Sequence, residues 1–212
     1  MPALRGGAVV SGHPPLGARP ELDARLVAAL ERVGQAARVS LRRETRRHGL
    51  TPTQAQLLSR LRTDPPRHRR VDILATRLDL THPTVSDAAS ALVRKGLVRR
   101  SRKGPDGRSP TLDLTPAGER TADELEAWQG PFLRALAARS APEKQRTLGL
   151  LLAVIEHLQR EGVITVARTC TTCRFFRRDV HAGPRPHHCA LLEVPLGDGD
   201  LRVDCPEHRR AA

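Results

Sequence analysis

One stretch of the chain, residues 71–114, constrains the fold more than any other. It begins with two short segments whose apolar residues recur at helical spacing, separated by a tight turn. Gly96 follows the second segment, in the position where glycine commonly ends a helix. Two strand-like segments then flank a tip rich in glycine, proline and basic residues. The predicted order is helix, turn, helix and basic β-hairpin, over residues 71–78, 79–81, 83–95 and 97–114.

Helices are predicted on both sides of this stretch. Residues 21–48 carry apolar side chains three and four positions apart, as on one face of a helix. Thr51-Pro52 suits the N-cap and first position of a helix over residues 54–61. Two long helices are expected after the hairpin, over residues 118–139 and 141–161. The predicted fold class is therefore mainly α with a small β-hairpin wing, an α+β winged helix-turn-helix.

The composition changes along the chain and indicates three parts. The first 20 residues contain four prolines and four glycines, which predicts a flexible arm and not a signal peptide. Helical spacing continues to about residue 162 and then gives way to cysteine, histidine, proline and glycine. The longest apolar run, residues 148–155, is too short to span a bilayer, so we expect a cytoplasmic protein without membrane contact. The predicted parts are an arm at 1–20, a winged-helix domain at 21–162, and a small Cys/His-rich module, the tail, at 163–212.

The charge of the chain indicates an anionic partner. Lysine and arginine number 36 against 23 acidic residues, a net charge of +13. Residues 60–110 hold thirteen of these basic residues and only five acidic ones, so much of the excess lies on the predicted helices and hairpin. Arginine suits phosphates and base edges. Double-stranded DNA is therefore the expected partner.

The helix over residues 83–95 is the predicted recognition helix, which enters the major groove with its N-terminal residues toward base edges. The hairpin tip is expected to reach the adjacent minor groove or the backbone. A purely structural role stays open for Thr81, which can cap the helix, and for Ser86, which can bond to backbone. The predicted DNA-binding residues are Thr81, His82, Thr84, Ser86 and Arg94 on or beside the helix, and Arg102, Lys103 and Arg108 on the tip.

Five short stretches of this region carry a family resemblance: Leu74-Ala75, residues 81–86, residues 92–98, residues 106–109 and residues 112–118. In order, spacing and residue type they resemble the MarR family of bacterial transcriptional regulators, and the resemblance extends over about residues 21–161. It implies a homodimer whose long N- and C-terminal dimerisation helices interlock. It also implies a pseudo-palindromic operator and repression that is relieved by a ligand or an oxidant.

Two acidic residues are notable in the light of this resemblance, one because it matches the family and one because it does not. Asp106 is expected to orient Arg108 toward DNA, as the Asp-x-Arg pair of the wing. Asp87 departs from the family, because many members carry arginine there. An acid facing phosphates is unfavourable, so Asp87 is expected to accept from a cytosine amino group or to pair with a nearby arginine.

All four cysteines of the chain fall within 36 positions of the tail, in the pattern C-x2-C-x15-C-x15-C. A C-x2-C turn brings two thiolates onto one ion or cluster, and two later ligands can complete the site. Phe175 and Phe176 adjoin the first pair and suit the apolar cover of a small metal-nucleated unit. The predicted ligands are Cys170, Cys173, Cys189 and Cys205, with His208 as a further candidate.

Three chemistries fit this pattern. An iron–sulfur cluster is preferred, because it uses all four cysteines and tolerates isolated third and fourth ligands. Zn²⁺ is the second possibility, supported by the expected cytosolic context and by His208, three residues after the last cysteine. Reversible disulfide chemistry without a metal is the third.

The predicted function is a homodimeric transcriptional repressor on the bacterial nucleoid, with redox, iron–sulfur or metal sensing through the tail. One alternative is the same regulator with a structural zinc tail, responding to a small aromatic effector. Another is a non-regulatory architectural DNA-binding protein. A thiol oxidoreductase using Cys170 and Cys173 is disfavoured because no βαβ pattern precedes the pair, so no enzyme is expected.

Overall fold

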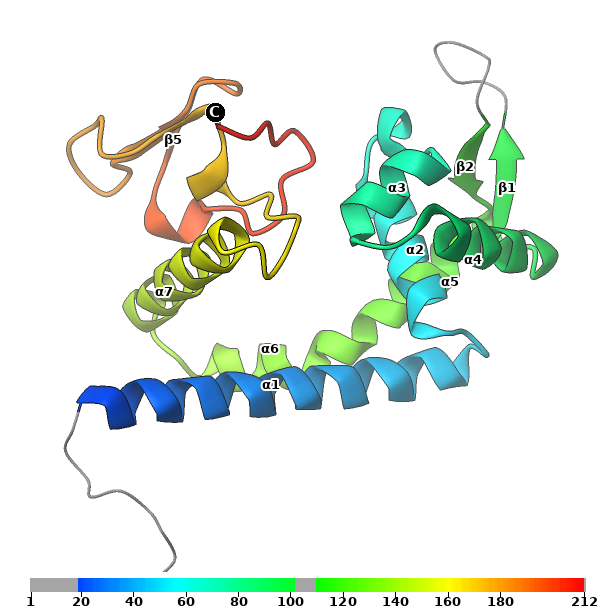
Figure 1. Ribbon diagram of the computed structural model, residues 1–212, viewed down its shortest axis with the longest axis horizontal. Coiled ribbons are helices and arrows are strands. Elements are labelled where there is room, and N and C mark those ends of the chain that lie inside the picture. The colour runs from blue at the N-terminus through cyan, green and yellow to red at the C-terminus, as the bar shows by residue number, and fades with distance from the viewer. Residues whose placement is uncertain (1–18, 102–109, 212) are drawn as a thin grey trace, which may run out of the picture. The chain divides into compact units, whose positions relative to one another are not determined.

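The computed structural model describes residues 19–101 and 110–211 (Figure 1). The chain divides into two compact units, residues 1–40 and 41–212, and each is described by itself. Helix α1 (Arg19–Arg47) forms the described part of the first unit and continues into the second. Apart from its last two residues, the predicted arm lies outside the described part of the chain. No helix in the described ranges is long and apolar enough to cross a membrane.

The predicted order of helix, turn, helix and hairpin is confirmed. The two strands pair antiparallel, with Val98 opposite Leu114 and Ser101 opposite Thr111. The middle of the hairpin, residues 102–109, is not described. These elements are α2 (Pro52–Thr63), the 3₁₀ helix η1 (Pro66–His68), α3 (Val71–Leu78), α4 (His82–Arg94), β1 (Val98–Ser101) and β2 (Thr111–Leu114).

Local interactions explain where these helices begin and end. The Thr51 hydroxyl accepts from the Gln54 N–H at 3.2 Å, and the Gln54 side chain accepts from the Thr51 N–H at 3.3 Å, a capping box that starts α2. Asp79 turns the chain between α3 and α4 with φ of 55°, a left-handed conformation that aspartate tolerates. Gly96 ends α4 with φ of 70°, which favours glycine.

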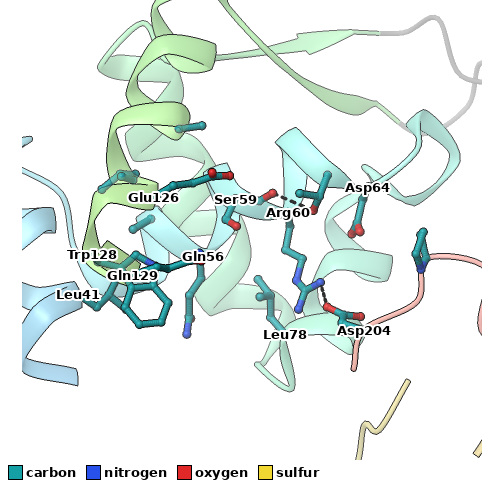
Figure 2. Close-up of a pocket in the computed structure, with 15 residues that line it drawn as sticks. Leu41, Gln56, Ser59, Arg60, Asp64, Leu78, Glu126, Trp128, Gln129 and Asp204 are labelled. Atoms are coloured by element: carbon teal, nitrogen blue, oxygen red, sulfur yellow. Dashed lines mark hydrogen bonds and ion pairs between the residues drawn. The ribbon is translucent and has the colours of Figure 1, made fainter. Parts of the chain in front are cut away.

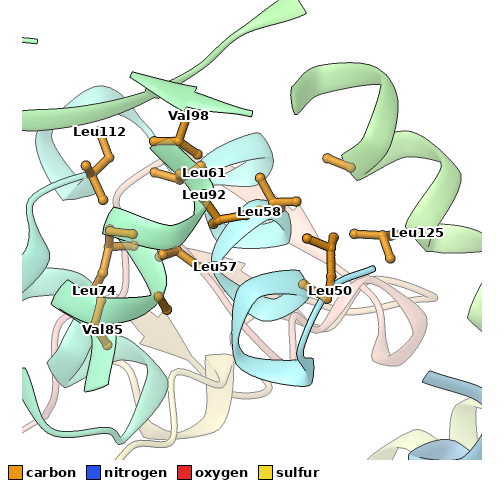
Figure 3. Close-up of a cluster of buried hydrophobic side chains, with 14 of the residues drawn as sticks. Leu50, Leu57, Leu58, Leu61, Leu74, Val85, Leu92, Val98, Leu112 and Leu125 are labelled. Atoms are coloured by element: carbon orange, nitrogen blue, oxygen red, sulfur yellow. The ribbon is translucent and has the colours of Figure 1, made fainter. Parts of the chain in front are cut away.

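The winged-helix elements and the next helix, α5 (Pro116–Leu125), enclose one apolar core (Figure 3). Helix α2 lies at its centre, since Leu57, Leu58 and Leu61 are completely buried. Val93 lies eight positions after the buried Val85 on α4 and is 36 % exposed. Eight positions along a helix turn a side chain about 80° away from the starting direction. The remaining core residues include Leu50, Leu74, Val85, Leu92, Val98, Leu112 and Leu125.

The single helix predicted over residues 118–139 is wrong. Helix α5 ends at Leu125, a 3₁₀ segment η2 (Glu126–Gln129) follows, and α6 (Gly130–Ala137) starts afresh. Pro131 lies at the beginning of α6, where its missing N–H costs no hydrogen bond, whereas it would break a continuous helix. The last predicted helix is confirmed as α7 (Ala141–Arg160), which a capping box between Ser140 and Glu143 starts.

After α7 the chain has little regular structure. Strands β3 (Phe176–Arg177), β4 (His187–Cys189) and β5 (Val194–Leu196) form an antiparallel sheet in that order. Two 3₁₀ helices, η3 (Cys170–Thr172) and η4 (Asp198–Asp200), pack against α7. Helix α7 and the two 3₁₀ helices of the tail are therefore neighbours within the second unit.

Candidate nucleic-acid interface and cysteine cluster

The first turn of α4 presents the polar residues predicted to contact DNA. Thr81 caps the helix, accepting from the Thr84 N–H at 3.3 Å, and the two hydroxyl oxygens lie 2.7 Å apart. His82 and Thr84 are exposed, whereas Ser86 is half-buried. Thr81 therefore has the structural role that was left open, and its hydroxyl is nevertheless exposed at the start of the helix.

A groove joins this helix start to the hairpin. It has a volume of about 370 Å³ and lies between α4, the start of α3 and the tip-side ends of the two strands. His82 and Ser86 line it from α4, Arg70 from the residue before α3, and Arg100 from β1. Pro110, which also lines it, directly follows the undescribed tip. The described structure thus brings the start of α4 and the tip-side ends of the strands to one depression, in which Arg70 is paired with Asp72 and Arg100 is the other lining cation.

Arg70 and Arg100 were not among the predicted DNA-binding residues. The Arg100 guanidinium donates to the Ser90 hydroxyl at 2.9 Å, so β1 and α4 are joined at this point. The sequence signal that could have identified Arg100 is its position as a basic residue in a short strand beside the hairpin tip. The predicted tip residues Arg102, Lys103, Asp106 and Arg108 lie outside the described residues.

The basic residues of residues 60–110 differ in their availability to DNA. Arg94 and Arg99 are exposed, and neither has an ion pair within the described ranges. The Arg77 guanidinium instead binds Asp64 with two 2.8 Å hydrogen bonds, and Asp64 is only 3 % exposed. The concentration of charge in this stretch therefore overstates the DNA-facing charge. The cations bound to carboxylates are Arg60, Arg62, Arg67, Arg69, Arg70 and Arg77.

Asp87 is exposed on α4 and makes no ion pair with any described residue. Of the two roles expected for it, pairing with a nearby arginine is therefore not seen in the described part of the chain. The other expected role, acceptance of a hydrogen bond from a cytosine amino group, stays a prediction.

A larger pocket of about 560 Å³ lies between α2, the α5–η2 segment and the tail (Figure 2). Trp128 and Gln129 line one side of it, and Arg60 of α2 lines another. The Arg60 guanidinium forms an ion pair with Asp204 of the tail, which also lines the pocket. The pocket thus combines an aromatic ring, a cation and a wall contributed by the tail.

The four cysteines of the tail line one small cavity of about 30 Å³. All four are free thiols and half-buried. The Arg202 N–H donates to the Cys170 sulfur at 3.2 Å, and the Arg202 guanidinium approaches the Cys205 sulfur at 3.7 Å. Burial raises the pKa of the Cys170 thiol, the Arg202 N–H opposes this, and the other three cysteines add to the rise. The other lining residues are Phe175, Phe176, Leu191, Leu192, Leu196 and Glu207.

The histidines of the tail have partners of their own. The His208 Nε2 atom lies 3.0 Å from the Thr172 hydroxyl, and His208 does not line the cysteine cavity. Burial lowers the pKa of His208. His187 is buried, with its Nε2 atom 3.0 Å from Asp198. Within the described ranges, no three or more His, Cys, Asp or Glu side chains converge on a point that could hold a metal ion.

Comparison with known proteins gives the fold of the winged-helix part. A family model described as "MarR family" matches residues 48–109. The MarR family transcription regulator SP03579 is 22 % identical with a TM-score of 0.59, over 68 % of this chain and 94 % of that one. No curated protein matches the chain.

Two further structures agree. The S. aureus MepR–DNA complex is 20 % identical with a TM-score of 0.54, over 62 % of this chain and 97 % of that one. The YusO protein from Bacillus subtilis is 21 % identical with a TM-score of 0.51, over 66 % of this chain and 99 % of that one. The chain thus has the helix-rich α+β winged-helix fold of MarR structures, and about a third of its length has no counterpart in them.

Proposed function

We propose that this protein is a DNA-binding transcriptional regulator of the MarR type, acting as a repressor in the bacterial cytoplasm and on the nucleoid. The observation that carries the proposal is the groove between the exposed start of α4 and the tip-side ends of the two strands, lined by His82 and Arg100. The match of residues 48–109 to the MarR family model and the fold shared with MepR, whose structure was solved with DNA, support it. We assign the chain no catalytic role.

The recognition helix is α4. Its exposed first turn, with His82 and Thr84, enters the major groove, and Thr81 and Ser86 contact bases or phosphates beside it. Arg94 lies at the other end of α4 and binds the phosphate backbone. We also propose DNA contacts beside the major groove for the tip residues Arg102, Lys103 and Arg108, with Asp106 as the partner of Arg108; all four lie outside the described residues.

A homodimer on a pseudo-palindromic operator is proposed because several helices expose apolar side chains. Large exposed apolar surfaces of this kind mark protein–protein interfaces. A symmetric dimer covers the same surface on both protomers and presents two recognition helices to a two-fold symmetric site. The exposed residues are Leu22, Leu26, Val27, Leu30, Val33 and Val39 of α1, Leu133 and Leu136 of α6, and Leu150 and Leu151 of α7.

The experiment that tests this function selects bound sequences from random duplex DNA and then measures affinity for the selected site. Arg94→Ala is expected to weaken binding by about tenfold, because a contact to DNA is lost. Arg139→Ala, which removes an exposed arginine after α6, is the matched control and is expected to bind normally. Failure to enrich any sequence, or equal affinities for the two variants, would refute the proposed interface.

We propose two signals to which the regulator could be built to respond, each detected at a different site. The first is metal, iron–sulfur or redox status, sensed by the cysteines of the tail. The second is a small aromatic acid in the pocket lined by Trp128 and Arg60, with the tail then a structural zinc unit. The pocket favours the second input through its ring and cation, but Arg60 is already bound to Asp204. The gathering of all four cysteines at one cavity favours the first.

A further inference from the structure

The four cysteines share a backbone arrangement as well as a cavity. Each cysteine carbonyl accepts a hydrogen bond from the N–H three residues later, at 3.0, 3.0, 3.2 and 3.2 Å for Cys170, Cys173, Cys189 and Cys205. Each cysteine therefore opens a tight turn. The one described backbone N–H that donates to a cysteine sulfur comes from outside these turns, from Arg202 to Cys170 at 3.2 Å, and bonds of this kind support thiolate ligands.

Two backbone hydrogen bonds hold the distant parts of the cluster together. The Cys170 N–H donates to the Arg202 carbonyl at 3.0 Å, and the Cys205 N–H donates to the Arg168 carbonyl at 2.9 Å. Cys189 is placed by β4, opposite Phe176. Cysteines up to 35 positions apart thus meet through the folding of the whole tail.

The arrangement of the four cysteines around the cavity favours a cluster over a single ion. Four thiolates on one Zn²⁺, at about 2.3 Å each, would lie within about 4 Å of one another. These cysteines instead surround a cavity of about 30 Å³ without converging on one point, among the described residues. A cluster binds each cysteine to a different corner iron, so its sulfurs stand further apart around an enclosed body.

The surroundings suit such a cluster. Two phenylalanines and three leucines give the cavity an apolar lining, although Leu191 and Leu192 are exposed at the surface. The Arg202 guanidinium, near the Cys205 sulfur, offsets the negative charge that thiolate ligation brings. Glu207 is the one acidic lining residue, and its carboxylate is bound to Arg67.

We propose that Cys170, Cys173, Cys189 and Cys205 hold an iron–sulfur cluster, and that the loaded tail fixes the winged helix relative to α7. This inference rests on the proposed function, whose sensing input it specifies. Binding of the cluster replaces the thiol proton of each cysteine by a bond to iron.

The path from the cluster to the winged helix is short. Asp204 directly precedes Cys205, and its carboxylate pairs with Arg60 of α2. Glu207 follows two residues later and pairs with Arg67 of η1. At the beginning of the tail, the Thr165 hydroxyl donates to Asp79 in the turn before α4. The same tail packs on α7 through η3 and η4, so it joins the two parts.

The loaded form is expected to bind the operator more tightly than the apoprotein. In a dimer, the angle between winged helix and long helices sets the spacing of the two recognition helices. A tail whose Cys205 is bound to the cluster restricts this angle. A dimer with a restricted angle loses less conformational entropy when it binds DNA. We expect an affinity difference of about tenfold, within the usual range of coupling between two sites.

The first test measures the cluster itself. The full chain is purified without oxygen, or its apoprotein is incubated with ferrous iron, sulfide and a thiol reductant. Iron and acid-labile sulfide are then counted per chain, together with visible absorption. Equal iron and sulfide with broad visible absorption are expected, and Cys189→Ser is expected to lose both. A colourless protein with one zinc per chain and no sulfide would overturn the cluster.

The second test measures the coupling in protein that keeps all four cysteines. Arg60→Gln and Arg67→Gln remove the two ion pairs from the side of the winged helix, so cluster content should stay normal while the loaded-to-apo affinity ratio falls toward one. Asp179→Asn, in the tail but away from α2, is the control and should keep the tenfold ratio. An unchanged ratio in the double variant would overturn the coupling. If the chain binds the cluster but selects no operator sequence, the proposed function is refuted and the cluster site is not.

Discussion

Arg60 and Arg67 lie in the stretch whose positive charge indicated DNA, and yet each is bound to a carboxylate of the tail. At the scale of single residues, charge in the sequence and charge available to a ligand are different quantities. Partners separated by about 140 positions leave no local pattern, so these pairs could not be predicted. The helical spacing did place the exposed residues His82, Thr84 and Arg94 on or beside one helix, which is α4.

The buried ion pair between Asp64 and Arg77 is expected to contribute strongly to stability. Asp64→Ala leaves the arginine charge without its partner, at a cost of about 3–5 kcal/mol in the free energy of unfolding. Asp72→Ala removes the partner of Arg70 at an exposed site and should cost about 0–1 kcal/mol. Urea denaturation of both variants measures the difference, and equal losses would contradict this account.

His68 is expected to make stability depend on pH. Burial lowers its pKa, and the charges of Arg77 and Arg67 lower it further. As the pH falls, His68 is therefore protonated in the unfolded chain at a higher pH than in the folded chain. The free energy of unfolding is unaffected by His68 above pH about 6.5 and decreases as the pH falls from there toward the lower pKa of the folded state. His68→Gln should lose less stability between pH 7.5 and 5.5 than the parent. Parallel urea midpoints for the two proteins would show that His68 is not responsible.

Asp87 is expected to influence which base is read. Asp87→Ala removes a carboxylate from the exposed face of α4, which should relax discrimination at one base pair by about 1–3 kcal/mol. The same change should strengthen binding to unrelated DNA, because repulsion from phosphates is removed. Competition with single-base operator variants measures both effects. Unaltered preference at every position would mean that Asp87 contacts no base.

At the scale of elements, Gly118 controls how α5 packs on the hairpin. A Cβ at this position would lie 1.9 Å from the Leu97 carbonyl oxygen, which is backbone and cannot move aside. Gly118→Ala is therefore expected to cost about 1–3 kcal/mol. Gly149→Ala in α7 meets nothing within 4 Å and should stabilise by up to about 1 kcal/mol. Thermal unfolding compares the two, and a Gly118→Ala variant as stable as the parent would contradict the close approach.

Elements with strong local signals were predictable. The capping residues at Thr51 and the glycine at position 96 mark helix limits in the sequence, and the structure agrees. The break between α5 and α6 was missed because apolar spacing continues across residues 126–129, while the decisive Pro131 lies just beyond. The groove beside α4 needs α3, α4 and both strands in place, so the fold alone could reveal it.

At the scale of the whole molecule, the tail adds to the fold shared with MarR structures. The similar structures cover about two-thirds of the chain, and the pattern of cysteines already indicated a separate chemistry for the tail. Cysteine spacing could not indicate that Asp204 and Glu207 would contact α2 and η1. These contacts depend on the three-dimensional path of the tail, and they connect its proposed cluster to the proposed DNA-binding surface.

The most direct measurement of the central claim is a hydroxyl-radical footprint on the selected DNA, with the number of protomers per site counted in parallel. A dimeric regulator should protect two half-sites one helical turn apart and bind with two protomers per site. An architectural protein would instead protect DNA uniformly at every sequence tested. Two symmetric protected segments are the predicted result, and uniform coverage or one protomer per site would contradict it.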